Sequence, residues 1–398
     1  MGNALTVPAH VPPELVIDFD PVADAALGRD LFARLAEIRD TAPPVAWSPY
    51  NGGHWMVFRH DDIRTVLRSP ERFTNRHISA GMVAQGGPPL IPLGMDPPEH
   101  TRWRMAMFKH LSAPKMRERG GAIRSVADRL IGDVAGKPQI EFVSSVAEPM
   151  PIEIFMNVMG LPTDKVDEFR ALAVKVLSQS NALGAEDRPD VQEANLAIAG
   201  HLAEVIEARR AEPRDDLVSR LLAETVNGEP IGFPELMSMC FLLFLGGLDT
   251  VTNAMTFGIR YLALHPDLQA EVRADRELIP GLVERLLRYT AFVNPQRQVV
   301  ADTELAGVAM QAGDFVWNIA WAGSNEPGGD TDGPQHLAFG DGPHICAGVH
   351  LARIELRTAY QSWFEQVGPF RLAPDPAPSM GGGAIMHIDR LLLELDPV

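Results

Sequence analysis

The hydrophobic and polar positions of this chain follow mainly a helical period. Apolar residues recur three and four positions apart over residues 31–39, 117–134, 152–159, 164–179, 191–211 and 282–289, which predicts helices with one buried face. Short alternating or β-branched runs, typical of strands, cover residues 54–58, 297–300, 314–319 and 388–395. The pattern therefore predicts a fold that is mainly α with minor β.

Two long helices frame this pattern. Residues 234–265 are apolar almost all round, begin with Pro234 in a first-turn position and end before Pro266, as expected of a helix through the centre of a large fold. Their most apolar run, 236–248, is shorter than the roughly 18 to 20 residues that span a bilayer. The second helix follows a glycine-rich stretch, and its apolar face comprises Val349, Ala352, Leu356, Tyr360, Trp363 and Val367.

The sequence contains no internal repeat and no low-complexity tract. Its 33 prolines and 34 glycines are scattered along the chain and form no linker, so we expect residues 1–398 to form a single domain. The first twenty residues lack the charged and apolar regions of a signal peptide. We therefore expect a cytoplasmic protein without a membrane partner.

Composition argues against one class of partner and indicates the cellular compartment. The 35 basic and 52 acidic residues give a formal net charge of −17, which argues against a surface that neutralises nucleic-acid phosphates. Only two cysteines are present, too few for a disulfide framework, which agrees with a reducing compartment.

One of these cysteines, Cys346, lies in the glycine-rich stretch, which reads FGDGPHICAG over residues 339–348. Free backbone N–H groups and the positive end of the following helix favour a thiolate there. Such a thiolate is compatible with a nucleophile, a zinc ligand or a haem ligand, and a buried inert cysteine is the alternative. Twelve histidines leave a base for a nucleophile available, whereas no CxxC or HExxH motif supports zinc.

The spacing FxxGxHxCxG in this stretch strongly resembles the cysteine loop of the haem-thiolate monooxygenases, the cytochrome P450 family. The resemblance implies a b-type haem between a long central distal helix and the proximal helix that follows the cysteine loop. It further implies that Cys346 is the axial iron ligand, Phe339 shields the sulfur and His344 reaches a propionate. A thiolate ligand favours O–O cleavage, and the lack of CxxCH indicates that the haem is not covalently attached.

The long apolar helix contains the sequence GGLDT from Gly246 to Thr250. Each interior glycine costs about 1 kcal/mol relative to alanine, so a compensating role is expected. One interpretation is close helix packing, with Thr250 bonding the carbonyl four residues earlier. The resemblance implies another, in which a small residue opens a groove for O2 and Asp249 and Thr250 deliver protons. The segment GGLDTVTNAM is most similar to the bacterial camphor-hydroxylase subfamily.

Three further residues are candidates for binding the haem carboxylates. His100 and Arg104 are four residues apart and share a helix face, and Arg297 lies on a later strand. Taken alone, each arginine is more simply explained as part of an ordinary solvated basic face. The resemblance implies that all three hold propionates, which need local cations in so acidic a protein.

The sequence departs from the family pattern on the proximal side. The ExxR signature would end at Arg288, but Arg285 occupies the position of its glutamate, and the acid, Glu284, comes one residue earlier. The segment before the cysteine loop is also short and lacks the usual Phe/Arg portion. We expect the proximal side of the haem to be held differently here.

The resemblance places Leu245, Gly246, Val293, Ala384 and Ile385 around the substrate. The loop 77–93 also borders the pocket, and it lacks the tyrosine that binds camphor, which disfavours camphor itself. We expect hydroxylation of a small apolar substrate, a cyclic terpenoid or an ionone-like norisoprenoid. A peroxide-dependent haem enzyme and a non-catalytic haem-binding sensor are the alternatives.

The source of electrons must lie outside the chain, because no GxGxxG unit for a flavin or nicotinamide follows a strand. The resemblance implies O2 as co-substrate, a [2Fe-2S] ferredoxin and its NAD(P)H-dependent reductase. We expect a monomer that receives this ferredoxin on a basic patch formed by Arg102, Lys109, His350 and Arg353.

Overall fold

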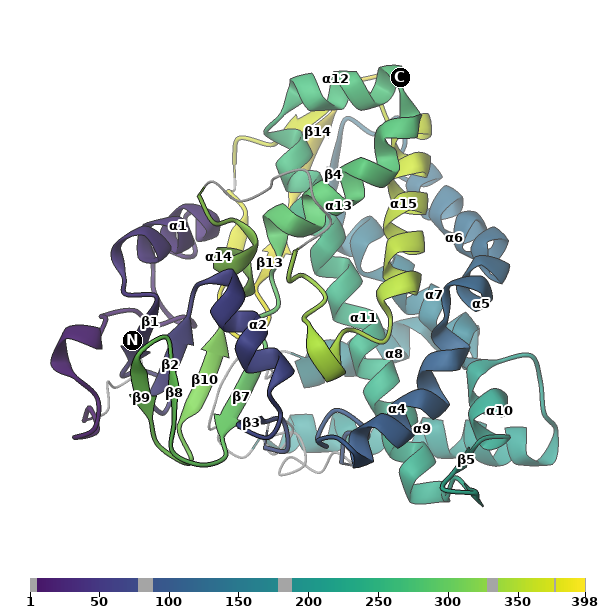
Figure 1. Ribbon diagram of the computed structural model, residues 1–398. Coiled ribbons are helices and arrows are strands. Elements are labelled where there is room, and N and C mark those ends of the chain that lie inside the picture. Colours follow the sequence, from purple (N-terminus) through teal and green to yellow (C-terminus); the bar gives the residue numbers. More distant parts are fainter. Residues whose placement is uncertain (1–5, 78–88, 178–187, 328–335, 376, 398) are drawn as a thin grey trace.

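The computed structural model describes residues 6–77, 89–177, 188–327, 336–375 and 377–397, and it is mainly helical with a smaller amount of sheet (Figure 1). The helices are α1 (Leu31–Thr41), α2 (His60–Arg68), α4 (Glu99–Phe108), α5 (Ala113–Glu118), α6 (Gly120–Gly132), α7 (Pro149–Met159), α8 (Val166–Leu177), α9 (Pro189–Ala211), α10 (Leu217–Leu222), α11 (Phe233–Ala263), α12 (Pro266–Ala274), α13 (Ile279–Thr290), α14 (Ala320–Ser324) and α15 (Val349–Gln366). The predicted fold class, mainly α with minor β, is confirmed.

The strands are short. They are β1 (Val45–Ser48), β2 (His54–Val57), β3 (Phe73–Thr74), β4 (Gln139–Glu141), β5 (Thr225–Val226), β6 (Glu229–Pro230), β7 (Gln296–Val299), β8 (Thr303–Leu305), β9 (Val308–Met310), β10 (Phe315–Asn318), β11 (Phe370–Leu372), β12 (Ser379–Gly381), β13 (His387–Arg390) and β14 (Leu392–Leu395). Five of them form one sheet in the order β1-β2-β10-β7-β3 beside the helices (Figure 1).

Helix α11 runs through the centre of the helical part and packs against α7, α9, α13 and α15 (Figure 1). It has apolar residues on all faces because other elements surround it, and most of its side chains are buried. It is the described helix that is long and apolar enough to cross a bilayer, yet 67% of its most apolar window is buried inside the protein. The predicted central core helix is confirmed.

The five-stranded sheet positions Arg297 for the site. Strand β10 runs parallel to β2 and antiparallel to β7, and this register pairs Val316 with Arg297. Large apolar residues such as Trp55 and Trp317 are fully buried in this sheet. Since side chains alternate between the two faces of a strand, the register turns Arg297 inward, and only 5% of this arginine is exposed.

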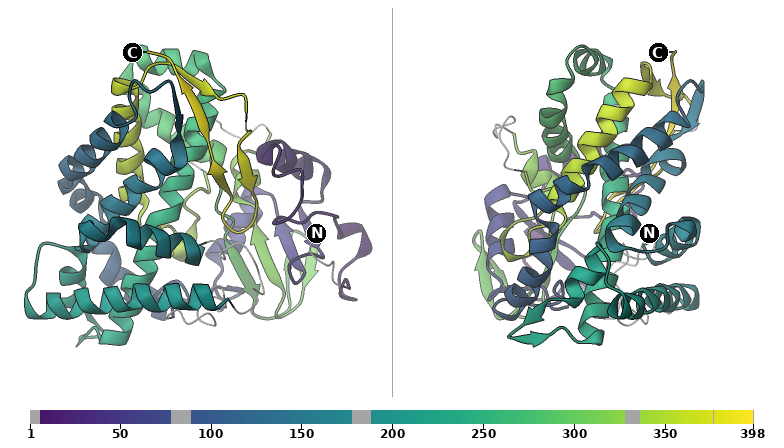
Figure 2. Two further views of the ribbon diagram at one scale, coloured as in Figure 1. Left: turned by 180° about the vertical axis from the view of Figure 1, so that it is seen from behind. Right: turned by 90° about the vertical axis from the view of Figure 1, so that its right-hand side faces the viewer.

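The C-terminal strands differ from the prediction. We expected one strand over residues 388–395, but β13 pairs with β12, whereas β14 pairs with β11 and β4. The chain changes sheets at the buried Leu391, whose N–H donates to the Glu141 carboxylate at 2.8 Å. Seen from behind, these strands extend past α11, and β13 contacts that helix (Figure 2).

The predicted helix over residues 117–134 is also divided. Helix α5 ends at Glu118 and α6 begins at Gly120, so the break lies at Arg119, next to two consecutive glycines. Glycine weakens a helix because it loses the most backbone freedom on folding. Helix α6 then packs along α15 (Figure 2).

Candidate active site

The cysteine loop is a tight turn that only glycine can complete. The Cys346 N–H donates to the Phe339 carbonyl at 2.8 Å, which closes the loop just before α15 begins. Gly340 and Gly342 have φ angles of 68° and 69°, in the left-handed region that favours glycine. A Cβ at Gly342 would lie 2.5 Å from the Leu67 carbonyl oxygen. Steric constraints therefore fix the loop against α2.

Cys346 borders an internal space. The residue is accessible to water, yet burial is the largest influence on its thiol and raises its pKa. Both observations hold if the sulfur faces a hollow inside the protein. The Gly348 N–H, Arg104 and Arg353 lower the pKa but do not outweigh burial. These three groups favour the thiolate, as the sequence predicts for this loop, and a coordinated metal cation would deprotonate the thiol.

The distal helix also borders an open space. Gly246 is exposed in the middle of the otherwise buried α11, and a Cβ added there would meet no atom within 4 Å. By contrast, a Cβ at Gly247 would lie 2.5 Å from the Phe155 ring on α7. The Thr250 hydroxyl donates to the Gly246 carbonyl at 3.0 Å. Close packing thus explains Gly247, whereas Gly246 leaves room for a small molecule.

Asp249 faces other elements than Thr250 does, since adjacent helix residues do not share a face. Burial raises the pKa of the Asp249 carboxyl, and His387 on β13 lowers it through its charge. Glu148, just before α7, raises it further by repulsion. This carboxyl therefore keeps its proton to a higher pH than an ordinary aspartic acid.

Four cationic or imidazole side chains gather next to the cysteine loop. The rings of His100 and His344 lie 4.1 Å apart, and the Arg104 guanidinium donates to the Ile345 carbonyl. Arg297 donates to the Asn75 amide oxygen at 2.8 Å, and the Asn75 amide nitrogen lies 3.4 Å from His344. The structure therefore brings together all four predicted propionate-binding residues.

Burial lowers the pKa of Arg104 and brings the pKa of His100 to about 4, that of His344 to about 2 and that of Arg297 to about 10. Neighbouring cations lower the values for both histidines further. The two His100 ring nitrogens and the His344 Nε2 have no hydrogen-bond partner among the described residues. Carboxylates would satisfy these nitrogens and offset the charge. The cluster therefore fits the two propionates of a haem whose iron is at Cys346.

Asn75 was missed by the sequence analysis. It follows β3 and is 1% exposed, and it contacts both Arg297 and His344. No local pattern distinguishes this asparagine from other polar residues, because its partners come from distant parts of the chain.

The apolar residues predicted for the substrate pocket come partly together. Val293 and Ile385 form an isolated antiparallel bridge, and the Asn294 N–H donates to the Ala384 carbonyl at 2.8 Å. Leu245 is buried in α11, which contacts the adjoining β13. Residues 78–88 of the predicted pocket loop lie outside the described residues.

A surface cavity of about 1130 Å³ lies on the outer side of the cation cluster. Thr74, Asp96, Thr101 and Arg102 are among its lining residues, whereas Cys346 and Asp249 are not. Neither the cysteine loop nor the GGLDT segment of α11 therefore lines this cavity.

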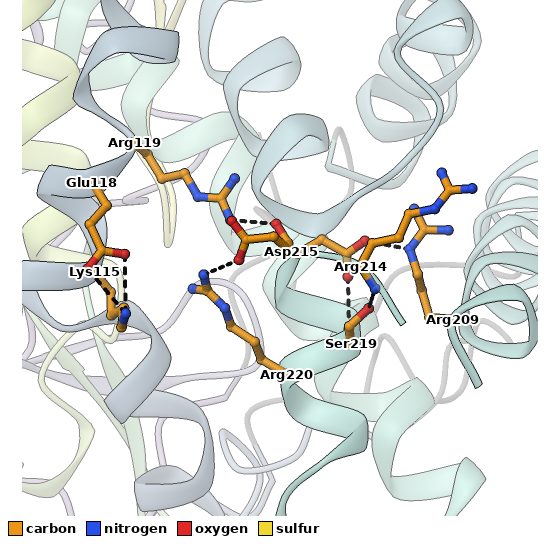
Figure 3. Close-up of polar contacts among 9 residues, drawn as sticks. Lys115, Glu118, Arg119, Arg209, Arg214, Asp215, Ser219 and Arg220 are labelled. Atoms are coloured by element: carbon orange, nitrogen blue, oxygen red, sulfur yellow. Dashed lines mark hydrogen bonds and ion pairs between the residues drawn. The ribbon is translucent and has the colours of Figure 1, made fainter. Parts of the chain in front are cut away.

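Acidic partners compensate much of the predicted basic patch. Lys109 pairs with Glu224, and Arg353 pairs with Glu284 at 2.7 Å. Nearby, Asp215 pairs with both Arg119 and Arg220 (Figure 3). Arg102 is exposed and has no ion-pair partner among the described residues.

Comparison with known proteins agrees with this geometry. The family model described as "Cytochrome P450" matches residues 164–283. Nocardicin C N-oxygenase of Nocardia uniformis subsp. tsuyamanensis is 30% identical, with 90% of this chain and 92% of that protein covered. The chain belongs to the cytochrome P450 family. The P450 linalool 8-monooxygenase of Pseudomonas putida is 28% identical over 86% of this chain and 89% of its own.

Solved P450 structures extend this likeness over nearly the whole chain. The crystal structure of CYP101J2 has a TM-score of 0.88 and 31% identity, covering 98% of this chain and 99% of its own. CYP101C1 has a TM-score of 0.87 and 30% identity, covering 98% and 100%. The predicted P450 fold and the relation to the camphor-hydroxylase subfamily are confirmed.

The enzyme class and cofactor follow from this membership. The chain is a P450 monooxygenase, an oxidoreductase that uses haem with an axial cysteine thiolate, and Cys346 occupies the cysteine position of the motif. No group of three or more His, Cys, Asp or Glu side chains that could hold a separate metal ion occurs within the described ranges.

Proposed function

We propose that this P450 hydroxylates a small apolar substrate, a cyclic terpenoid or an ionone-like norisoprenoid. The open space beside Gly246 carries the proposal, because the pocket candidates around it, Leu245, Val293 and Ile385, are all apolar. Such a site gains affinity by removing apolar surface from water and offers little to a charged ligand. The relative linalool 8-monooxygenase gives further support, since its name specifies linalool, a small terpenoid.

Different residues of the chain have different roles in this reaction. When bound, the haem supplies the oxygen-activating chemistry, with Cys346 as its axial ligand and Phe339 shielding the sulfur. His100, His344, Arg104 and Arg297 would hold its propionates. Asp249 is the candidate proton donor, and burial raises the pKa of its carboxyl. Thr250 borders the open space, and its hydroxyl oxygen retains lone pairs that can accept a proton through water.

The remaining assignments extend the proposal to the whole molecule. Residues 1–398 form one P450 domain, supported by solved relatives that cover 98% of the chain. The enzyme works as a cytoplasmic monomer with O2, a [2Fe-2S] ferredoxin and an NAD(P)H-dependent reductase. Exposed Arg102 contributes a cation for ferredoxin docking, whereas Lys109 and Arg353 are already paired.

Spectral titration tests the substrate class. The ferric holoenzyme is titrated with a panel of ionones and cyclic monoterpenoids, and with charged analogues of similar size. A compact apolar ligand should displace water and shift the ferric spin state, and the charged analogues should not. A spin shift confined to the charged compounds would contradict the proposal.

Turnover distinguishes the reaction types. Product should form with ferredoxin, reductase, NADH and O2 at a much higher rate than with peroxide alone, because Asp249 and Thr250 are present to supply protons. A faster reaction with peroxide would indicate a peroxide-dependent enzyme. Ligand-induced spin shifts with no product under either condition would indicate a sensor.

A further inference from the structure

Glu284 joins three parts of the proximal side. Its carboxylate accepts two hydrogen bonds from Arg353 on α15, at 2.7 and 2.8 Å. The His336 Nε2 lies 3.3 Å from the same carboxylate, and His336 precedes the cysteine loop. Arg357, one turn further along α15, approaches to 3.6 Å. One acid on α13 therefore holds α15 and the segment that leads into the cysteine loop.

Two of the partners of Glu284, Arg353 and His336, contact Phe339, the first residue of the cysteine loop. The Arg353 guanidinium lies over the Phe339 ring, 4.7 Å from its centre, and the His336 ring lies 5.8 Å away. The Phe339 carbonyl in turn accepts the hydrogen bond of the Cys346 N–H. A continuous series of contacts thus connects Glu284 with the sulfur-bearing residue.

The Glu284 carboxylate is stabilised in its charged form. Burial raises the pKa of Glu284, but hydrogen bonds from His336 and Arg353 outweigh it and bring the pKa to about 2. The His336 side chain is 2% exposed, so its contact with Glu284 is shielded from water. Bidentate arginine–carboxylate pairs have a fixed geometry, which single surface ion pairs lack.

The position where the family motif places a glutamate does not supply this contact. Arg285 directs its guanidinium to the Tyr261 hydroxyl on α11, at 3.4 Å, and so faces away from the cysteine loop. The neighbouring Glu284 is the acid that reaches α15.

We propose that Glu284 is a positioning residue for the bond between Cys346 and the haem iron, because it holds Arg353 and His336 against Phe339. Loss of this carboxylate leaves Arg353, Arg357 and His336 without their shared acceptor. The guanidinium then leaves the Phe339 ring, and the cysteine loop moves away from its ligating position. The inference rests on the assignment of Cys346 as the iron ligand.

The test uses the reduced, CO-bound holoenzyme, whose red-shifted Soret band reports an intact thiolate ligand. Glu284→Gln should lose this band about tenfold faster than the wild type. Hydrogen bonds to a charged group are stronger than those to a neutral one, so a glutamine holds the cysteine loop less firmly than the carboxylate does. Arg124→Gln is the matched control. Arg124 also ties α15 to a neighbour, through Asp128 on α6 and Glu365 on α15, but far from Phe339 along the helix. The control should decay within about twofold of the wild type.

A double-mutant cycle tests the pathway through Arg353. Glu284→Gln, Arg353→Gln and the double variant should lose the thiolate band at similar rates, because each breaks the same unit. Glu284→Asp keeps the charge and should recover part of the lifetime. The reduction potential of the iron should shift in the Glu284 and Arg353 variants and stay constant in the Arg124 variant, which a purely structural role would not produce.

The outcomes separate the inference from the site assignment. A wild type without the thiolate band would refute Cys346 as ligand, and the inference would fail with it. A wild type with the band, and a Glu284→Gln decay equal to that of Arg124→Gln, would overturn the inference alone. If Glu284→Gln does not retain haem, Arg353→Lys takes its place, since it keeps the charge but loses the bidentate contact. A Lys variant with the wild-type lifetime and potential would likewise overturn the inference.

Discussion

At the scale of single residues, adjacent residues of one motif have different physical roles, even where they are of the same type. Gly246 borders open space, whereas Gly247 is needed because the Phe155 ring leaves no room for a Cβ. Similarly, Asp249 and Thr250 are adjacent in sequence, but one faces charged groups on other elements and the other borders the open space. Neighbouring residues of one motif therefore meet separate physical requirements.

The two glycines should respond in opposite ways to alanine. Gly246→Ala should stabilise the fold by up to about 1 kcal/mol, because alanine favours a helix and meets no neighbour there. Gly247→Ala should destabilise it by about 1–3 kcal/mol through overpacking against the buried Phe155. Denaturant unfolding of both holoenzymes measures the difference. Equal effects of the two substitutions would refute the distinction.

A buried acid on α15 should make stability depend on pH. Glu355 is 1% exposed, its Oε2 has no hydrogen-bond partner among the described residues, and burial raises its pKa well above the ordinary value. The native state therefore binds this proton more tightly than the unfolded chain, and stability falls as pH rises above the unfolded value of about 4.5.

Glu355→Gln removes this titration. The variant should melt at a higher temperature than the wild type at neutral pH, and the gain should shrink as the pH approaches about 4. Thermal unfolding followed by circular dichroism at a series of pH values provides the measurement. A difference in melting temperature that is constant with pH would contradict the expectation.

At the scale of elements, two faces of one helix have different roles. One face carries the candidate haem-binding residues, and the other carries surface charge. On α4, His100 and Arg104 face the cysteine loop, whereas Arg102 lies on the exposed side and lines the surface cavity. The i, i+4 spacing predicted this shared face correctly. The tertiary structure brings His344 and Arg297 beside them, as the family resemblance implies.

Two arginines on α4 provide a matched test of this face. Arg104→Gln should release haem about tenfold faster or more, because it removes a charge-assisted hydrogen bond to a propionate and the contact with the Ile345 carbonyl. Arg102→Gln should leave haem release unchanged. Transfer of haem to an excess of an apo-globin measures both rates. Equal rates would place the propionates elsewhere.

At the scale of the whole molecule, three buried histidines make stability depend on pH. Burial lowers the pKa values of His54 to about 4, His100 to about 4 and His344 to about 2. The unfolded chain binds these protons first, so the contribution of these histidines to stability is fully present above about pH 6.5 and is lost as the pH falls toward 4.

Removal of the haem should increase this sensitivity to acid. Propionates raise the pKa values of His100 and His344, while His54 is distant in sequence and lies on the sheet strand β2. The haem-free protein should therefore lose melting temperature more steeply between about pH 6.5 and 4 than the holoenzyme. Parallel melting profiles of the two forms would contradict a role for these histidines at the propionates.

The sequence alone determined the family and the helical character, and it named most of the residues that we propose for the site, because these depend on local period and on motifs of fixed spacing. It located α11, the cysteine loop and the α4 face to within a few residues. The prediction from sequence was wrong about the bounds of single elements. Residues 388–395 have one continuous strand pattern, but the partners that divide it into β13 and β14 lie elsewhere in the chain.

Only the tertiary structure decided which groups act together. Glu284 meets Arg353 across 69 positions of sequence, and Asn75 meets Arg297 across 222. The ionisation of Cys346 likewise depends on burial by the whole fold as well as on the helix that follows it. Contacts between distant segments and the exclusion of water depend on packing in three dimensions, which the order of residues along the chain does not display.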